Sequence, residues 1–294
     1  MSNPLLDIRI GTMVRGNLAD PAAYVRAILP LGFESIQPFF WQTIGDADVK
    51  IGALGMFGNP LEDQPLDRET RAGWETLIDN AHLFGTDIVA GFTGRLRGRP
   101  LPESLPRFRE VWGSLAALAA DRGVRIAFEN CAMDGNWASG DWNIAHNPDA
   151  WEMMFDALPD ENVGLEWEPC HQMVYLIDPV PQIREWASRI FHVHGKDATV
   201  RWDVIRRHGI FGKHRFVEMR TPGFGDSDWA SVIGDLRLAG YRGSIDIEGW
   251  HDPVYRDALE LTGQKRALDY LRDCRGGTEY VPELQGSELP RTEA

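Results

Sequence analysis

Apolar residues in this chain form short runs, which alternate with longer stretches where apolar positions recur every three or four residues. The short runs are rich in β-branched and aliphatic residues and end in polar residues or glycine, as is typical of strands. The runs that we interpret as strands are Ile8–Met13, Ser35–Pro38, Val49–Met56, Asp87–Phe92, Val124–Glu129, Val163–Glu168, Arg189–His194 and Ser244–Glu248.

The stretches between these runs predict helices, because a spacing of three to four places apolar side chains on one helical face. The predicted helices are Arg68–Phe84, Leu105–Arg122, Pro148–Leu158, Pro181–Ser188, Asp228–Ala239 and Tyr255–Asp273. Gly32, Gly123 and Gly240 each precede a strand, where a left-handed residue commonly ends a helix. Alternating β and α units predict parallel strands joined by crossovers, so we expect an α/β fold of the (β/α)8 type, a TIM barrel.

The chain of 294 residues has no linker near its middle, so we expect a single domain. The catalytic barrel is predicted to span residues 1–275, and residues 276–294 lack periodicity and are predicted to form an extended tail. Two connections, Ala132–Asn147 and Ala198–Thr221, are long enough to act as lids or substrate-binding segments.

Composition narrows the class of protein. With 43% hydrophobic and 25% charged residues the chain has the makeup of a soluble globular protein. Its 30 Lys and Arg against 44 Asp and Glu give a net charge of −14, which argues against a nucleic-acid partner. No leader or membrane-spanning run is visible, and the three cysteines are scattered, so we expect a cytoplasmic protein without membrane partners.

Polar residues end the last four barrel strands, where the chemistry of a TIM barrel is placed. These residues are Glu129, Glu168, His194 and Glu248. Three carboxylates brought together would repel one another, and a divalent ion removes that conflict. The sequence therefore predicts a metal site, and its oxygen-rich donor set favours Mn²⁺, with Mg²⁺ or Co²⁺ as alternatives.

Side chains alternate across a strand, so Glu166, His192 and Asp246 share the faces of the proposed ligands one layer deeper. We interpret these three as interior groups that hydrogen-bond to one another or to the ligands rather than as ligands themselves.

The motifs AFEN at 127–130, GLEWEPCH at 164–171, HVHGKD at 192–197, PGFGDSDW at 222–229 and GYRGSIDIEGW at 240–250 carry a family resemblance. The chain resembles the xylose isomerase-like barrels of the sugar phosphate isomerase/epimerase superfamily from about Ile8 to about Arg275. The resemblance implies that Glu129, Glu168, His194 and Glu248 bind the metal and that Glu129 and Glu248 are the catalytic acid and base. It also implies that His171 contacts substrate oxygens. Glu168 departs from the aspartate common at its position.

Other residues are candidates for substrate contacts. The segment after Glu129 contains Trp142, whose face could stack on a sugar ring, and His146, which is either a proton-transfer residue or a helix-entry residue. Lys196 and Arg220 could bind substrate oxygens, although Lys196 could instead pair with Asp197.

The leading hypothesis is a metal-dependent isomerase or epimerase that acts on a sugar or keto-sugar through proton abstraction and a metal-stabilised enediolate. The alternative is a metal-dependent lyase that cleaves 3-keto-glycosides by β-elimination, a reaction that the resemblance also allows. An endonuclease conflicts with the acidic charge, and a non-catalytic assembly subunit is a further alternative. The expected partners are a small-molecule substrate and either further copies of the chain or a small second subunit.

Overall fold

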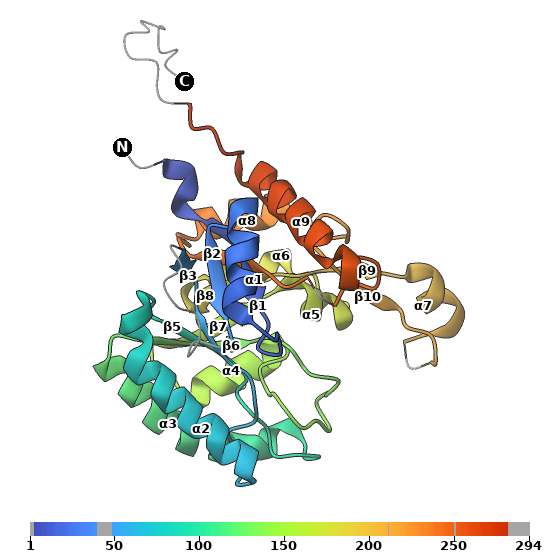
Figure 1. The fold of residues 1–294 in the computed structure, drawn as a ribbon. Coiled ribbons are helices and arrows are strands. Elements are labelled where there is room, and N and C mark those ends of the chain that lie inside the picture. The colour runs from blue at the N-terminus through green and yellow to red at the C-terminus, as the bar shows by residue number, and fades with distance from the viewer. Residues whose placement is uncertain (1–2, 40–48, 211, 250, 282–294) are drawn as a thin grey trace, which may run out of the picture.

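The computed structural model of the protein describes residues 3–39, 49–210, 212–249 and 251–281 (Figure 1). Its main sheet is a nearly closed parallel barrel with the strand order β3-β2-β1-β11-β8-β7-β6-β5-β4, so the predicted TIM barrel is confirmed. The barrel strands are β1 (Arg9–Val14), β2 (Ser35–Pro38), β3 (Lys50–Ile51), β4 (Leu54–Met56), β5 (Ile88–Gly91), β6 (Arg125–Glu129), β7 (Val163–Trp167), β8 (Ile190–Gly195) and β11 (Ser244–Ile247).

The strand expected at Val49–Met56 is two strands, so that part of the prediction was wrong. β3 pairs with β2, whereas β4 pairs with β5. Between them a Cβ added at Gly52 would lie 2.3 Å from a carboxylate oxygen of Asp246, so the backbone at Gly52 packs directly against the polar interior. Only glycine permits this close approach, and the seam of the barrel falls here.

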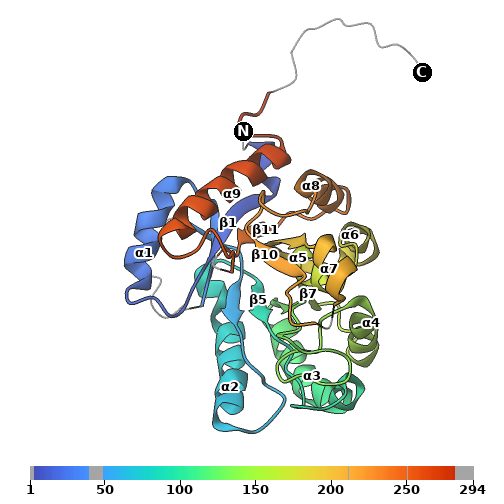
Figure 2. The same ribbon diagram turned by 90° about the vertical axis from the view of Figure 1, so that its right-hand side faces the viewer.

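Helices surround the barrel, as the view in Figure 2 shows. They are α1 (Pro21–Ile28), α2 (Pro65–Asn80), α3 (Leu105–Asp121), α4 (Pro148–Ala157), α5 (Pro169–Val174), α6 (Val180–Glu185), α7 (Trp202–His208), α8 (Trp229–Leu238) and α9 (Glu260–Arg275). Short 3-10 helices occupy Pro4–Asp7, Leu29–Leu31, Ala81–Phe84, Leu101–Ser104, Ala187–Arg189 and Asp257–Leu259. None of the helices in the described part of the chain is long and apolar enough to cross a membrane.

All six predicted helices are present with shifted ends, and Gly32, Gly123 and Gly240 have the expected positive φ. Three helices, α1, α5 and α7, were not predicted. Each has eight residues or fewer, which is too short for a helical period to stand out in the sequence. In the predicted tail, residues 276–281 form no regular element, and residues 282–294 lie outside the described chain.

The connection Ala198–Thr221, expected to be a loop, contains regular structure. β9 (Asp197–Val200) and β10 (Val217–Arg220) form an antiparallel pair, with Asp197 opposite Arg220, and α7 lies at the end of this pair. We call residues 197–220 the arm, because they project from the barrel in Figure 1. The two strands have only four residues each, too few for their alternation to stand out in the sequence.

The apolar core lies between the strands and the helices that cover them. Trp74 of α2 and Trp112 of α3 meet edge to face with ring centroids 4.8 Å apart, and Trp112 packs in the same way on Phe128 of β6 at 4.5 Å. The indole nitrogen of Trp112 donates to the carbonyl of Thr93, so this large buried ring leaves no donor unpaired. This packing holds β6, and therefore Glu129, against the helical layer.

Ion pairs tie α9 to the start of the chain. Arg275 of α9 donates to the carbonyl of Ile8 and to Glu34, which also accepts from the backbone nitrogen of Ile10 at 2.9 Å. Arg272 contacts the same carboxylate. Burial alone would raise the pKa of Glu34, but the hydrogen bonds from Arg275 and Ile10 outweigh it and lower this pKa. Charge pairing therefore contributes to barrel closure.

Replacing Glu34 with Gln should lower the free energy of unfolding by about 1–3 kcal/mol at neutral pH, because the buried Arg275 and the partly buried Arg272 lose their carboxylate partner. Since the folded-state pKa of Glu34 is depressed, its stabilisation is present above the unfolded value of ~4.3 and is lost as the pH falls through the folded value. The free energies of unfolding of wild type and Glu34→Gln, measured by urea denaturation, should therefore become equal at acidic pH. The exposed Glu69→Gln substitution is the control, and equal stability of Glu34→Gln and wild type at neutral pH would contradict the argument.

Candidate metal centre

The ends of four neighbouring strands place the predicted ligands together. Glu129 is the last residue of β6, Glu168 directly follows β7, His194 lies near the end of β8, and Glu248 directly follows β11. One potential ligand atom from each of these residues lies within 4.8 Å of the others, and all four residues are buried. The convergence that the sequence predicted for these side chains is thus present in the structure.

Asparagine side chains hold the backbone where the strand ladder ends. The amide of Asn130 donates to the carbonyl of Glu168 at 2.8 Å and accepts from the backbone nitrogen of Glu168 at 2.9 Å. Asn143 donates to the carbonyl oxygens of Glu129 and Cys131, both at 2.7 Å. These bonds replace missing ladder partners, so they fix the positions from which the carboxylates project.

A deeper polar layer supports His194. His192 lies 2.9 Å from both Glu166 and Asp246, which confirms the expectation that these three are hydrogen-bonded interior groups. The Nε2 atom of His194 lies 2.7 Å from Oε1 of Gln37, an acceptor, so Nε2 carries the hydrogen. The other ring nitrogen, Nδ1, faces the cluster, 3.4 Å from Glu129 and 3.8 Å from Glu248.

Gln37 was missed by the sequence analysis. Its amide also donates to Glu166 at 2.5 Å, so it joins β2 to both β7 and β8 across the barrel interior. The available signal was a polar residue near the end of a short apolar strand. His251, which lies 2.9 Å from Glu248, was also missed, although it is a histidine three residues after a proposed ligand.

The donor atoms of the cluster fit a divalent cation. In the described part of the chain, no well-formed hydrogen bond reaches either carboxylate oxygen of Glu168, Nδ1 of His194 or Oε2 of Glu248, although His171 and Lys196 lie within ion-pair distance of Glu168 and Glu248. Buried polar atoms without partners are costly, and three buried carboxylates repel one another. A cation held by these atoms relieves both costs, and oxygen-rich ligands suit Mn²⁺ or Mg²⁺. The identity of the metal stays a prediction.

Lys196 adds a positive charge beside the cluster. Its Nζ atom lies 3.0 Å from Glu248, 3.9 Å from Glu168 and 3.2 Å from Nε2 of His171. Burial alone would lower the pKa of Lys196, but the charge of Glu248 outweighs it and raises this pKa, so the ammonium form persists. The alternative pairing with Asp197 does not occur, because Asp197 accepts from Ser227 and Trp229.

The carboxylates of the cluster differ in their surroundings. Burial raises the pKa of Glu129, and the negative charges of Glu248 and Glu166 raise it further. His194 acts to lower this pKa, but its effect is smaller than theirs together with burial. Burial also acts to raise the pKa of Glu248, but Lys196 and His251 outweigh it, so this pKa falls well below its usual range. The pKa values of Glu129 and Glu248 are therefore shifted in opposite directions, because of these two carboxylates Glu248 is the one that pairs with Lys196.

The other predicted substrate contacts have partners of their own. The Nε2 atom of His171 lies 2.6 Å from Glu168, so this residue lies at the cluster. Arg220 pairs with Asp252 at 3.0 Å, and the ring of Trp142 lies 6.0 Å from the guanidinium of Arg97. The contacts given for Arg220 and Trp142 do not include the four cluster residues, and their substrate contacts stay predictions.

His146 is buried and stacks on Tyr175, with ring centroids 5.4 Å apart. Neither ring nitrogen has a hydrogen-bond partner among the described residues. Burial, with a smaller effect from Arg95, lowers the pKa of His146 to about 4, so the ring is neutral at neutral pH. The helix that follows is capped by Asn147 rather than by His146. Whether His146 transfers protons stays a prediction.

A family model described as xylose isomerase-like TIM barrel matches residues 30–274. The chain belongs to this family. It is 36% identical to the rhizopine catabolism protein MocC of Rhizobium meliloti over 229 residues, which are 74% of this chain and 68% of that protein. It is 24% identical to an inosose dehydratase of Klebsiella pneumoniae over 217 residues, 66% of this chain and 68% of that enzyme.

Solved structures of similar fold include two sugar epimerases. An L-ribulose 3-epimerase superposes with a TM-score of 0.66 at 16% identity, covering 92% of this chain and 96% of its own. A 3-keto-D-glucoside 4-epimerase from E. coli gives 0.66 at 14% identity, covering 91% and 100%. At this level of identity these likenesses establish the fold alone. This xylose isomerase-like barrel thus shares its fold with two sugar epimerases and is similar in sequence to an inosose dehydratase.

After treatment with EDTA, the protein should take up one Mn²⁺ ion per chain, at the cluster of Glu129, Glu168, His194 and Glu248. A second group of possible ligands, Glu166, His192 and His194, shares His194 with this cluster, and its members already hydrogen-bond to one another and to Gln37 and Asp246. His194→Ala and Glu168→Gln should each weaken binding tenfold or more, a loss of about 1.4 kcal/mol or more in binding free energy. Isothermal titration calorimetry measures both stoichiometry and affinity. The exposed Glu75→Gln substitution should bind like wild type, and unchanged affinity in both cluster variants would exclude this metal site.

Proposed function

We propose that this protein is a divalent-metal-dependent enzyme that removes a proton from the carbon beside a ketone in a sugar-like polyol, as an isomerase or epimerase of keto-sugars. The observation that carries the proposal is the cluster of Glu129, Glu168, His194 and Glu248, with buried donor atoms that no well-formed hydrogen bond reaches within the described chain. Membership of the xylose isomerase-like family, together with a fold shared with a sugar epimerase, supports a sugar-like substrate.

Each residue of the cluster has a definite task in this proposal. Glu129, Glu168, His194 and Glu248 hold the cation, which when bound supplies electrostatic stabilisation for negative charge on substrate oxygens. Glu129 and Glu248 lie 3.4 and 3.8 Å from Nδ1 of His194 and act as the acid and base. One carboxylate takes the proton from carbon, which leaves an enediolate, and a proton is then returned to a different atom or face.

Lys196 and His171 are placed to bind the substrate. The ammonium of Lys196 is buried, contacts Glu248 and His171, and donates up to three hydrogen bonds. A hydroxyl of the substrate beside Glu248 would accept one of these bonds, which orients the adjacent carbon toward the carboxylate. Burial of the cluster excludes bulk water, so these interactions act in a medium of low polarity.

Glu129→Gln and Glu248→Gln should each reduce kcat by about 100-fold to 10,000-fold, because an amide cannot exchange a proton with carbon. Circular dichroism should show that both variants remain folded. The conservative Glu69→Gln substitution on α2 is the control for a lost surface charge. Turnover at the wild-type rate in either cluster variant would remove that carboxylate from the acid and base pair.

A second candidate is a lyase that eliminates a leaving group, either water or the aglycone of a 3-keto-glycoside. The similarity of the chain to inosose dehydratases supports it, because a dehydratase eliminates water. The first half of the reaction is the same proton removal. In the second half the carbon–oxygen bond to the leaving group breaks, and Lys196 can supply the proton that the departing oxygen takes up.

Incubation of Mn²⁺-loaded protein in D₂O with keto-sugars, inosose and 3-keto-glycosides distinguishes the two candidates. Isomerisation or epimerisation should place deuterium on carbon and interconvert sugars without release of a fragment. Elimination should instead release water or aglycone and leave an unsaturated ketone, which absorbs ultraviolet light. Absence of both deuterium exchange and elimination with every substrate, in protein shown to bind Mn²⁺, would contradict both candidates.

A further inference from the structure

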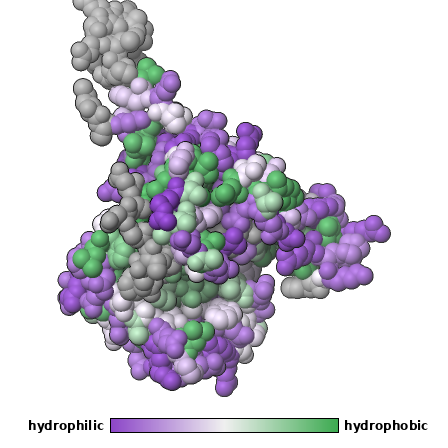
Figure 3. Space-filling model, in the orientation of Figure 1, coloured by the Kyte–Doolittle hydropathy of each residue, from purple (hydrophilic) through white to green (hydrophobic). Residues whose placement is uncertain are grey.

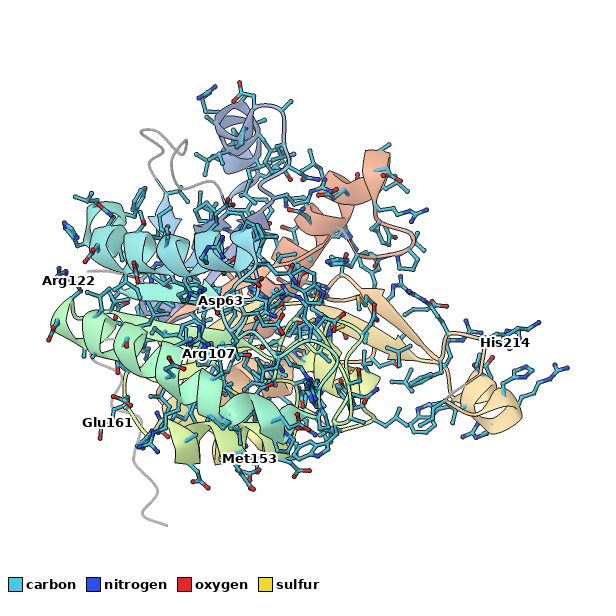
Figure 4. All side chains as sticks on the ribbon, turned by 90° about the horizontal axis from the view of Figure 1, so that it is seen from below. Asp63, Arg107, Arg122, Met153, Glu161 and His214 are labelled. Atoms are coloured by element: carbon cyan, nitrogen blue, oxygen red, sulfur yellow. The ribbon has the colours of Figure 1, made fainter. Side chains whose placement is uncertain are left out.

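The arm carries a positive charge that the rest of the molecule lacks. Its tip, residues 201–215, contains five Lys or Arg and one Asp, a net charge of +4, so the remainder of the chain carries −18. The exposed cations of the tip with no ion-pair partner among the described residues are Arg206, Arg207, Lys213 and Arg215. Figure 4 shows His214 at the far end of the arm, well away from the barrel.

The root of the arm borders an apolar groove of about 280 Å³. Leu176, Ile177 and Trp202 are among its lining residues, and Trp202 is 50% exposed. The exposed acidic residues Asp178 and Asp226 also line it. We call this the arm groove. It therefore combines apolar side chains with negative charge, whereas the surface of the tip in Figure 3 is mainly hydrophilic.

Leu176 presents an apolar side chain to solvent at the arm groove. This leucine is 38% exposed and has a φ of +60°, a left-handed conformation that costs a non-glycine residue about 1–2 kcal/mol. The backbone nitrogen of Leu176 donates to the carbonyl of Met173 at 3.0 Å, which holds the residue in this conformation. This is the left-handed turn that commonly ends a helix, here α5, and it fixes the position of an apolar side chain that stays exposed at the arm groove.

We propose that the arm mediates pairing with a second copy of this chain, in which the basic tip of each copy docks in the acidic arm groove of the other. Both complementary halves of this contact lie on one chain, which a twofold symmetric pair requires. Ile210 at the tip, 39% exposed, supplies the apolar contact for the groove. Arg206 and Arg207, four and three residues before Ile210 in the chain, would pair with Asp178 and Asp226 of the second copy.

The net negative charge of the rest of the chain favours a second copy of the chain, rather than a polyanion such as nucleic acid, as the partner of the basic tip. A surface with a net charge of −18 outside the tip repels nucleic acid, whereas it attracts the tip of another copy. Apolar contacts with a charged border are the usual anatomy of a protein interface. Because the border is ionic and exposed, salt should weaken the pairing.

Sedimentation velocity of the full chain over a range of concentrations tests the pairing. Wild type should form a dimer that dissociates more readily as the salt concentration rises. The double substitution Arg206→Glu with Arg207→Glu should raise the dissociation constant at least about tenfold. The matched control is Arg109→Glu with Arg266→Glu, which changes two exposed arginines outside the arm and should leave the dimer intact.

A charge exchange then tests the partner surface. Asp178→Lys alone should also weaken the dimer, and circular dichroism should show that it is folded. When the tip variant and the Asp178→Lys variant are mixed, native mass spectrometry should detect a mixed pair in preference to either self-pair, because each tip then meets a groove of opposite charge. A monomeric wild type, including one that binds heparin through the arm, would overturn the proposal, as would a tip variant that dimerises like wild type.

Discussion

Mutual repulsion among three buried carboxylates is the constraint on which the rest of this structure depends. Glu129, Glu168 and Glu248 present atoms within 4.8 Å of one another and of His194, deep in a barrel that excludes water. Such an arrangement is stable only where positive charge compensates it. Within the described residues, Lys196 supplies a fixed cation beside Glu248. His171 lies beside Glu168, but no well-formed hydrogen bond reaches the oxygens of Glu168 or Nδ1 of His194. In the proposed function, a divalent cation would complete the compensation.

The barrel interior beneath the cluster explains how His194 presents one nitrogen to it. Gln37 binds Nε2 of His194 and also contacts Glu166, which with His192 and Asp246 forms a continuous polar chain. Every link is buried, so each must be hydrogen-bonded, and the chain therefore determines the orientation of the ring. The same polar layer presses against glycine backbone at Gly52, where the barrel has its seam. Asp246, which packs against the seam, thus also belongs to the polar chain that orients His194.

Much of the fold and of the candidate site follows from local sequence patterns. The strand ends at Glu129 and His194 could be located because apolar runs stop there. The convergence of their side chains could then be inferred, because the parallel strands of a barrel end on the same face. The seam at Gly52 could not be located, since nothing in the run from Val49 to Met56 indicates which neighbour each half pairs with. The arm was likewise missed, because its strands are short and its helix has no strong period.

By itself the sequence determined the kind of barrel, the residues at its strand ends and the separation of ligands from the deeper polar layer, because alternation and periodicity are properties of neighbouring residues. Only the tertiary structure decided that Lys196 contacts Glu248 rather than Asp197, and that Gln37 reaches His194 across 157 positions. Those contacts depend on strand register and on how far each strand is shifted along the barrel, and both are set by packing between segments distant in the chain.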